Sequence, residues 1–192
     1  MNEKQKRGLL LAVAFLLPLV FVIVIFVSTY IPSRTLSTDY NFVYAICSEG
    51  NAPYSYYCSN HLSNLYTIEN GRLIENEIPA DLDSDNDGVS DRNENYRTRL
   101  FLHNNTSNSS EEISLAEAQR LTLDDRLTSP DGVAVEWQYT NGGSFFPFVR
   151  YSGNYGYFLT RGNARKEIDL INESQRRYYQ NDFMFLGWVI PR

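Results

Sequence analysis

Residues 183–190, FMFLGWVI, decide the fold, because they carry no charged or amide side chain. A strand with one solvated face alternates between apolar and polar residues, whereas a short apolar run rich in aromatic and branched residues is typical of a strand covered on both faces. We therefore expect residues 183–190 to lie centrally in a β-sheet.

Shorter strand patterns, separated by turn signals, run from residue 41 onward. Val133, Val135, Trp137 and Tyr139 alternate with residues that are smaller or polar, which predicts a strand with one buried face. Asn70-Gly71 predicts a hairpin over residues 65–74, because a type I′ turn needs positive φ at both central positions. Other strands are expected over residues 41–47, 97–103, 145–151, 155–160 and 167–171.

Turn and helix signals complete the predicted domain. Ser114 and Glu117 have the spacing of a capping box and open a short helix, SLAEAQRL. Ser129-Pro130-Asp131-Gly132 predicts a tight turn. Residues 104–112, NNTSNSSEE, contain no apolar side chain and predict a mobile surface loop. We expect one mainly β domain over residues 41–192, an antiparallel meander or small sandwich with one short helix.

Three segments form a weak internal repeat, in which an aromatic-rich strand precedes an Asn- or Gly-bearing turn: LYTIENGRLIE, RLFLHNNTS and YFLTRGNARKEIDL. Together with the SPDG turn, residues 96–172 are similar to blade segments of WD-like β-propellers in bacterial envelope proteins. A closed propeller needs about four four-stranded sheets, which is more than this chain can supply. The resemblance therefore implies only an antiparallel, blade-like meander.

The N-terminus carries a candidate membrane anchor. Residues 8–27, GLLLAVAFLLPLVFVIVIFV, contain no charged side chain, and ~20 helical residues span a hydrocarbon core of ~30 Å. A cleaved signal peptide is the alternative, but it would have an apolar region of only ~7–15 residues and a small-x-small cleavage site. We expect a transmembrane signal anchor over residues 8–31, followed by a linker over residues 32–40.

Charge and cysteines indicate on which side of the membrane the domain lies. Lys4, Lys6 and Arg7 precede the apolar run, so the positive-inside rule predicts a cytoplasmic tail over residues 1–7 and an extracytoplasmic domain, anchored by a single pass in the plasma (inner) membrane. Cys47 and Cys58 are the two cysteines. In an oxidising compartment they are expected to form a disulfide, with two free thiols as the alternative.

The acidic stretch Asp83 to Glu94 has the residue pattern of a Ca²⁺ loop. Alternate residues of a curled loop point inward, so Asp83, Asp85 and Asp87 can direct carboxylate oxygens at one ion, while Gly88 permits the bend. Val89 would add its backbone carbonyl, Asp91 would bind directly or through water, and Glu94 would close the sphere bidentately. A solvated acidic linker is the alternative, but a linker has no reason to keep this spacing.

These residues resemble the DxDxDGxxDxxE calcium loops of thrombospondin type 3 repeats and dockerins. The resemblance implies that Asp83, Asp85, Asp87, Asp91 and Glu94 are side-chain ligands and that Val89 is a carbonyl ligand of a structural Ca²⁺. Two features depart from an EF-hand: Ser90 replaces a branched apolar residue, and neither flank reads as a long amphipathic helix. A structural site is expected rather than a sensor that opens.

Composition excludes some function classes and leaves others open. Of the 192 residues, 23 are acidic and 17 basic, and the part after residue 7 carries a net charge of −8, so nucleic acid is not an expected partner. The two His are expected at the surface, and there is no G-x-S-x-G nucleophile motif. Aromatic side chains at strand spacing are first of all core, but they could also line a glycan-binding cleft. This set comprises Trp137, Tyr139, Phe145, Phe146, Phe148 and Tyr155.

The sequence therefore predicts a membrane-anchored, calcium-binding β module of the cell envelope with an interaction or assembly role. Its expected partner is another envelope protein, with a surface or cell-wall glycan as the alternative. A carboxylate-dependent hydrolase is a third possibility, for which Glu136 on the predicted Trp137 strand is the acid outside the calcium loop.

Overall fold

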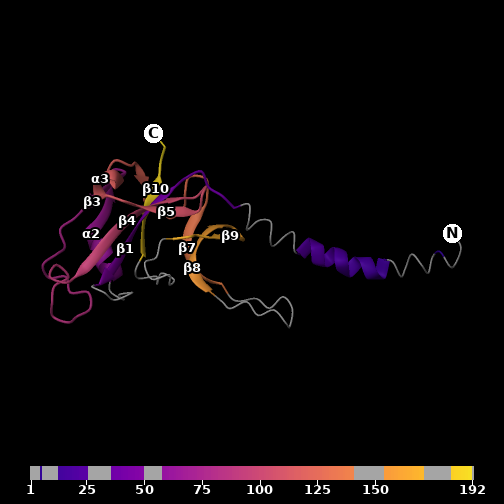
Figure 1. The fold of residues 1–192 in the computed structure, drawn as a ribbon, viewed down its shortest axis with the longest axis horizontal. Helices are drawn as coiled ribbons and strands as arrows, with labels where there is room; N and C mark the ends of the chain where they lie inside the picture. The colour runs from indigo at the N-terminus through magenta and orange to yellow at the C-terminus, as the bar shows by residue number, and fades with distance from the viewer. Residues whose placement is uncertain are drawn as a thin grey trace.

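The computed structural model describes residue 5 and residues 13–25, 36–49, 58–140, 154–170 and 183–191. Within these ranges the protein consists mainly of antiparallel β-sheet with few helices, as the sequence predicted (Figure 1). The elements of the β domain are β1 (Phe42–Glu49), α2 (Cys58–Leu65), β2 (Tyr66–Glu69), β3 (Arg72–Glu75), β4 (Tyr96–Asn104), β5 (Ser109–Ile113), α3 (Leu115–Ala118), β6 (Leu123–Asp124), β7 (Ala134–Thr140), β8 (Asn154–Arg161), β9 (Ala164–Glu167) and β10 (Phe183–Val189).

A five-stranded sheet in the order β5-β4-β1-β10-β6 forms the centre of the domain. β1 pairs antiparallel with β4 along its whole length and with β10 on its other side. β10 also pairs with the two-residue strand β6, so it has neighbours on both edges, as its apolar sequence predicted. Trp188 packs into the core on one side of the sheet and Leu186 into the core on the other, which confirms that both faces of this strand are covered.

One face of the central sheet packs on a second sheet, β7-β8-β9. Phe42, Tyr44 and Ile46 of β1 contribute to this core from one side, and Val135 and Leu159 contribute from the other. Such face-to-face packing of two antiparallel sheets is a small sandwich. Val133 and Val135 are buried, as the alternating pattern predicted.

The other face of the central sheet is covered by α2, the β2-β3 hairpin and α3. Val43, Ala45 and Cys47 alternate with the residues of the first core and point to this second layer. Leu62 of α2 and Leu73 of β3 are fully buried against them. The central sheet therefore lies between two cores, which leaves β1 without a solvated face.

The predicted turns are present. Asn70 and Gly71 both have positive φ, 49° and 73°, and connect β2 to β3. In the SPDG turn, the Gly132 amide donates to the Ser129 carbonyl at 2.9 Å, and Gly132 has φ 84°. The capping box is also confirmed: Ser114 accepts from the Glu117 amide, and the Glu117 carboxylate accepts from the Ser114 amide.

The structure differs from the sequence prediction in two strands. Residues 109–113, which include much of the predicted loop 104–112, form β5 and pair with β4. β5 is polar because it is an edge strand that lies largely in solvent. β9 begins at Ala164 and ends at Glu167, earlier than the predicted strand 167–171. The predicted strand 145–151 lies outside the described residues.

The three segments of the weak internal repeat lie in three different sheets. LYTIENGRLIE forms the β2-β3 hairpin, RLFLHNNTS lies on β4 in the central sheet, and YFLTRGNARKEIDL spans β8 and β9. Each segment therefore has different neighbours, and the blade resemblance stays a prediction.

The described part of the predicted anchor, residues 13–25, is helical, and its apolar side chains are exposed, with Phe15 at 79%. Residues 8–12 and 26–31 of that segment lie outside the described residues. Among the described residues, no helix reaches the length and apolar character needed to cross a membrane.

Candidate metal site

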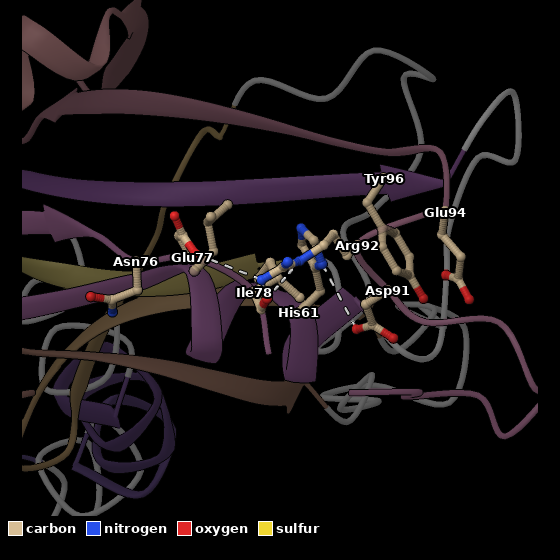
Figure 2. A pocket seen from close by; sticks show the side chains of 9 residues that line it. His61, Asn76, Glu77, Ile78, Asp91, Arg92, Glu94 and Tyr96 are labelled. Carbon is tan, nitrogen blue, oxygen red and sulfur yellow. Dashed lines mark hydrogen bonds and ion pairs between the residues drawn. The ribbon is translucent and has the colours of Figure 1, made fainter. Parts of the chain in front are cut away.

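The acidic stretch Asp83 to Glu94 lies between β3 and β4 and forms a loop closed at its base. The Asp91 amide donates to the Leu82 carbonyl at 2.8 Å, which brings the two ends of the loop together. Next to this contact, the Asp91 carboxylate accepts from the Ser84 amide at 2.8 Å and from the Ser84 hydroxyl at 2.7 Å. Asp91 is 2% exposed and lies beside His61, as Figure 2 shows.

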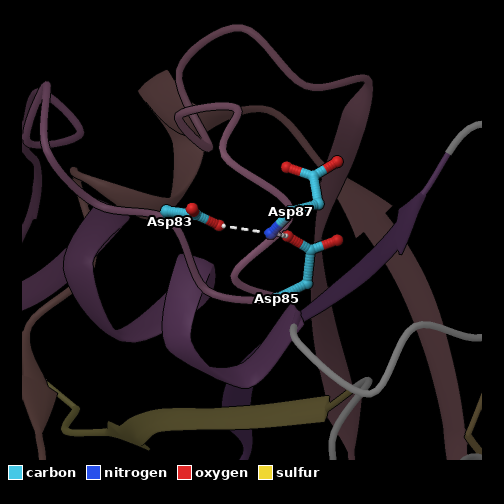
Figure 3. Close-up of side chains that lie close together, drawn as sticks. All are labelled: Asp83, Asp85 and Asp87. Atoms are coloured by element: carbon cyan, nitrogen blue, oxygen red, sulfur yellow. Dashed lines mark hydrogen bonds between the residues drawn. The ribbon is translucent and has the colours of Figure 1, made fainter.

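Three of the predicted ligands converge above this base. One carboxylate oxygen from each of Asp83, Asp85 and Asp87 lies within 4.8 Å of the other two (Figure 3). Oxygens that share one Ca²⁺ at ~2.3–2.6 Å are separated by distances of this order. The structure therefore brings together the three carboxylates that the sequence places at alternate positions.

Backbone amides hold these carboxylates in place. Asp83 accepts from the amides of Asp87, at 3.2 Å, and Gly88, at 3.0 Å. The Asp87 amide also donates to Asp85 at 3.1 Å, and the Val89 amide donates to Asp87 at 2.7 Å. Gly88 has φ 89°, in the region that favours glycine, and this bend directs successive amides toward the carboxylates.

Asp91 and Glu94 do not belong to this cluster, and the ligand role of the Val89 carbonyl stays a prediction. Asp91 instead ties the base of the loop to Ser84. The side chain of Val89 is 42% exposed. Glu94 lies just before β4, and both of its carboxylate oxygens are buried without a hydrogen-bond partner.

Lost hydration and neighbouring negative charges disfavour the ionised forms of Asp85 and Glu94. Loss of hydration raises the pKa of Asp85, and the negative charges of Asp87 and Asp83 raise it further. Burial raises the pKa of Glu94 against the lowering effect of the nearby Tyr96 hydroxyl, and the charges of Asp85, Asp91 and Asp87 add to the increase. A bound divalent cation would reverse these unfavourable interactions, because it favours the charged form of every carboxylate near it.

A cavity of about 420 Å³ opens beside the loop (Figure 2). Asp91 and Glu94 form part of its wall together with residues from α2, the segment after β3 and the start of β4. The full lining comprises His61, Leu65, Asn76, Glu77, Ile78, Asp91, Arg92, Glu94 and Tyr96. Two predicted calcium ligands therefore line a pocket that sequence reasoning did not predict.

His61 enters this pocket from α2, an element that the sequence patterns did not indicate. Its side chain is 7% exposed, and its ring lies 4.5 Å from the Tyr96 ring, centroid to centroid. Nδ1 makes no hydrogen bond and lies 3.8 Å from the Asp91 carboxylate. Burial lowers the pKa of His61, although Asp91 opposes that change. The only sequence signal for α2 is the helical spacing of Cys58, Leu62 and Leu65.

Arg92 also lines the pocket and connects the acidic loop to the segment after β3. Its guanidinium donates to the Ile78 carbonyl from Nε at 3.0 Å and from Nη2 at 2.6 Å, and Nη2 lies 3.7 Å from the Glu77 carboxylate. These contacts tie the loop to the segment that follows β3. They also occupy the only guanidinium in the pocket lining, which leaves Asp91 and Glu94 without a cationic partner there.

The prediction that both His lie at the surface is wrong. His103 is fully buried on β4, where its Nδ1 lies 2.9 Å from the Ser110 hydroxyl, and burial lowers its pKa to about 4. His61 is buried as described above. Each imidazole ring is packed between neighbouring elements. The sequence around a single His does not show whether tertiary packing will bury it.

Glu136 and the aromatic side chains have the following surroundings. Glu136 is exposed on β7 and accepts from Gln138 at 2.6 Å. Trp137 is stacked on Tyr155 at 6.0 Å and meets Tyr157 edge-on at 4.9 Å, within the first core. Tyr155 is 52% exposed. Phe145, Phe146, Phe148 and the side chain of Tyr139 lie outside the described part of the chain.

Cys47 is 4% exposed on β1, and the described residues contain no free cysteine. Cys58 begins α2, but its side chain lies outside the described part. The pairing of the two stays a prediction.

The chain matches no protein-family profile, and no curated protein or solved structure is similar to it.

Proposed function

We propose that this protein is a calcium-braced β module displayed outside the membrane by an N-terminal anchor. The carboxylates of Asp83, Asp85 and Asp87, gathered within 4.8 Å of one another, carry the proposal. Gly88 and the amide contacts that fix these carboxylates support it. The module takes part in interaction or assembly rather than in covalent chemistry.

The donor set fits Ca²⁺ better than other ions. All available ligands are carboxylate or carbonyl oxygens, which hard cations prefer over transition metals. The loop offers many oxygens without an octahedral arrangement, whereas Mg²⁺ requires near-ideal octahedral geometry. Glu94 supplies the further ligand: its two buried carboxylate oxygens gain a cationic partner when they turn toward the ion. Asp91 stays with Ser84 and acts on the ion through a water or as a nearby charge.

Calcium would stabilise this module by joining its layers. The loop begins after the β2-β3 hairpin, which covers one face of the central sheet, and ends at β4, a strand of that sheet. An ion held between Asp83 and Glu94 would connect the cover to the sheet. The ion would also relieve the repulsion between the acidic side chains. Because Ca²⁺ would bind the folded loop and not the unfolded chain, its binding free energy would add to the folding stability.

The anchor and the disulfide complete the proposal. The segment over residues 8–31 places the domain outside the cytoplasm, where Ca²⁺ is abundant and cysteines are oxidised. The exposed apolar side chains of the helix over residues 13–25 support a role in contact with lipid. Digestion of the domain by protease added outside sealed cells tests this orientation, and protection of the domain there would reverse it.

An envelope protein is the proposed partner. Glycan binding remains the second candidate because the Tyr155 ring is half exposed beside Trp137. The two rings face each other in a stack rather than lying side by side in one plane, so they offer a sugar one free face at most. This arrangement favours the protein partner.

Thermal unfolding of the full-length protein in a non-ionic detergent tests the calcium proposal. Wild type should melt several degrees higher in millimolar Ca²⁺ than in EGTA, because a ligand that binds only the folded state stabilises it. Asp85→Asn should lose this increase, whereas Asp125→Asn, a matched change of an exposed acid outside the loop, should keep it. An equal melting temperature with and without Ca²⁺ in wild type would refute the proposal.

A further inference from the structure

The pocket beside the calcium loop presents several buried acceptor atoms that have no donor. Nδ1 of His61 and both carboxylate oxygens of Glu94 are buried without a hydrogen bond, and all line the same cavity. His61 is 93% buried, given its exposure of 7%. Leaving a buried polar atom without a hydrogen bond is unfavourable, and such atoms call for an unseen partner.

The negative charge of the lining favours a partner that donates hydrogen bonds and carries positive charge. The pocket lining contains the carboxylates of Glu77, Asp91 and Glu94 but one guanidinium, and Arg92 already uses that group on Ile78 and Glu77. His61 Nδ1 and the Asp91 carboxylate lie 3.8 Å apart. A single ammonium nitrogen can lie at hydrogen-bond distance, ~2.9 Å, from both atoms.

The shape and the apolar part of the lining indicate an organic cation rather than a bare ion. The cavity measures about 420 Å³, within the ~300–1,000 Å³ typical of small-molecule pockets. Leu65, Ile78 and the ring of Tyr96 provide the apolar part of the wall. Such a wall suits the methylene stem of an amine, and the Tyr96 ring adds a surface that attracts cations.

We propose that this pocket binds the primary ammonium group of an aliphatic amine and that Ca²⁺ weakens this binding. His61, Asp91 and Glu94 receive the ammonium, and Tyr96 packs on the stem. The same chemistry is presented by a free polyamine and by a lysine side chain of a partner protein. The antagonism rests on the proposed function, because Glu94 serves either the ion or the ammonium.

The coupling follows from the place of Glu94 in the chain. It belongs both to the calcium loop and to the pocket wall, and its two carboxylate oxygens are buried there beside the Tyr96 hydroxyl. When it closes the coordination sphere of Ca²⁺, the pocket loses one acceptor and one negative charge. Linkage then requires the reverse effect of equal size, so the amine weakens Ca²⁺ binding by the same factor.

Calorimetric titration of the full-length protein in detergent tests this assignment. In EGTA, wild type should bind 1,5-diaminopentane, whereas 1-pentanol, which lacks the ammonium, should give no heat. His61→Phe keeps a ring against Tyr96 but removes the acceptor, and Glu94→Gln keeps the shape but removes the charge. Each should weaken amine binding about tenfold or more. Asp125→Asn, remote and exposed, should leave it unchanged.

Two further titrations identify the source of the ammonium and the coupling. Binding of N-acetyl-lysine-methylamide supports a lysine side chain of a partner, whereas binding of diaminopentane alone supports a free polyamine. Saturating Ca²⁺ should weaken amine binding in wild type but not in Asp85→Asn. If neither amine binds, or if both pocket variants bind as wild type does, the pocket assignment is overturned. If Ca²⁺ itself does not bind, the calcium proposal fails. The amine titrations in EGTA then still show whether the pocket binds an ammonium group.

Discussion

Asp91 and Ser84 form a double hydrogen bond at the base of the acidic loop: the buried carboxylate accepts from both the amide and the hydroxyl of the serine, at 2.8 and 2.7 Å. This pair fixes the base of the loop before any ion is present. The carboxylates of Asp83, Asp85 and Asp87 are then presented on an ordered frame. Asp91, expected from its spacing to be a ligand, is therefore first of all a structural residue.

Replacement of Ser84 by Ala should destabilise the domain by about 1–3 kcal/mol, because the buried Asp91 carboxylate loses one of its two donors. Chemical denaturation of the full-length protein measures this change. Ser37→Ala, which removes an exposed hydroxyl elsewhere, should change the unfolding free energy by less than about 0.5 kcal/mol. Equal effects of the two changes would show that the Ser84 hydroxyl does not hold the loop.

Gly187 allows β10 and β6 to approach closely. A Cβ at this position would lie 2.9 Å from the Asp124 carbonyl oxygen, so Gly187→Ala should destabilise by about 1–3 kcal/mol through separation of the two strands. Gly156→Ala is the matched control on β8, where the nearest atom would lie at 3.6 Å. A smaller cost for Gly187→Ala than for Gly156→Ala in denaturation experiments would contradict the described pairing.

His103 should make the domain less stable in mild acid. Burial lowers its pKa in the folded state from 6.5 to about 4, so the unfolded chain binds a proton more readily and the neutral ring favours folding above pH 6.5. This contribution is lost as the pH falls toward 4 and amounts to about 2 kcal/mol between pH 7.5 and 5. His103→Leu should reduce the loss of stability over this interval by that amount. NMR titration of the His103 ring provides the direct check, and an apparent pKa near 6.5 would refute it.

Much of the β structure could be predicted from the sequence because its signals are local. The apolar run of β10, the Asn70-Gly71 turn and the alternation on β7 each follow from strand geometry alone. α2 could not be predicted, because CSNHLSNL is rich in Ser and Asn, which favour other backbone conformations. Burial of Leu62 against the central sheet stabilises this helix, so the signal is tertiary rather than local.

The candidate site was predicted only in part for a similar reason. The spacing of Asp83, Asp85 and Asp87 is sufficient to bring their carboxylates together, because one turn of chain contains them all. The partner of Asp91 and the surroundings of Glu94 depend on α2 and β4, which are remote from the loop in sequence. His61 therefore could not be linked to the acidic loop until the fold was known.

Cys47 and Cys58 should be joined by a disulfide. In guanidinium without reductant, neither should react with an alkylating reagent, and after reduction both should react. Denaturation is needed in this test because Cys47 is buried and would resist labelling as a thiol too. Reduction should also lower stability by about 3 kcal/mol. Labelling of both cysteines in the denatured, unreduced chain would exclude the bond.

Calorimetric titration of the full-length protein with Ca²⁺ tests the central claim most directly. The account predicts one saturable site per chain in wild type, and loss of that site when Asp85→Ala and Glu94→Ala are combined. Mg²⁺ at the same concentration should produce a much weaker response, because the loop does not impose octahedral geometry. Absence of binding heat in wild type, or an unchanged site in the double variant, would contradict the assignment of a calcium loop to residues 83–94.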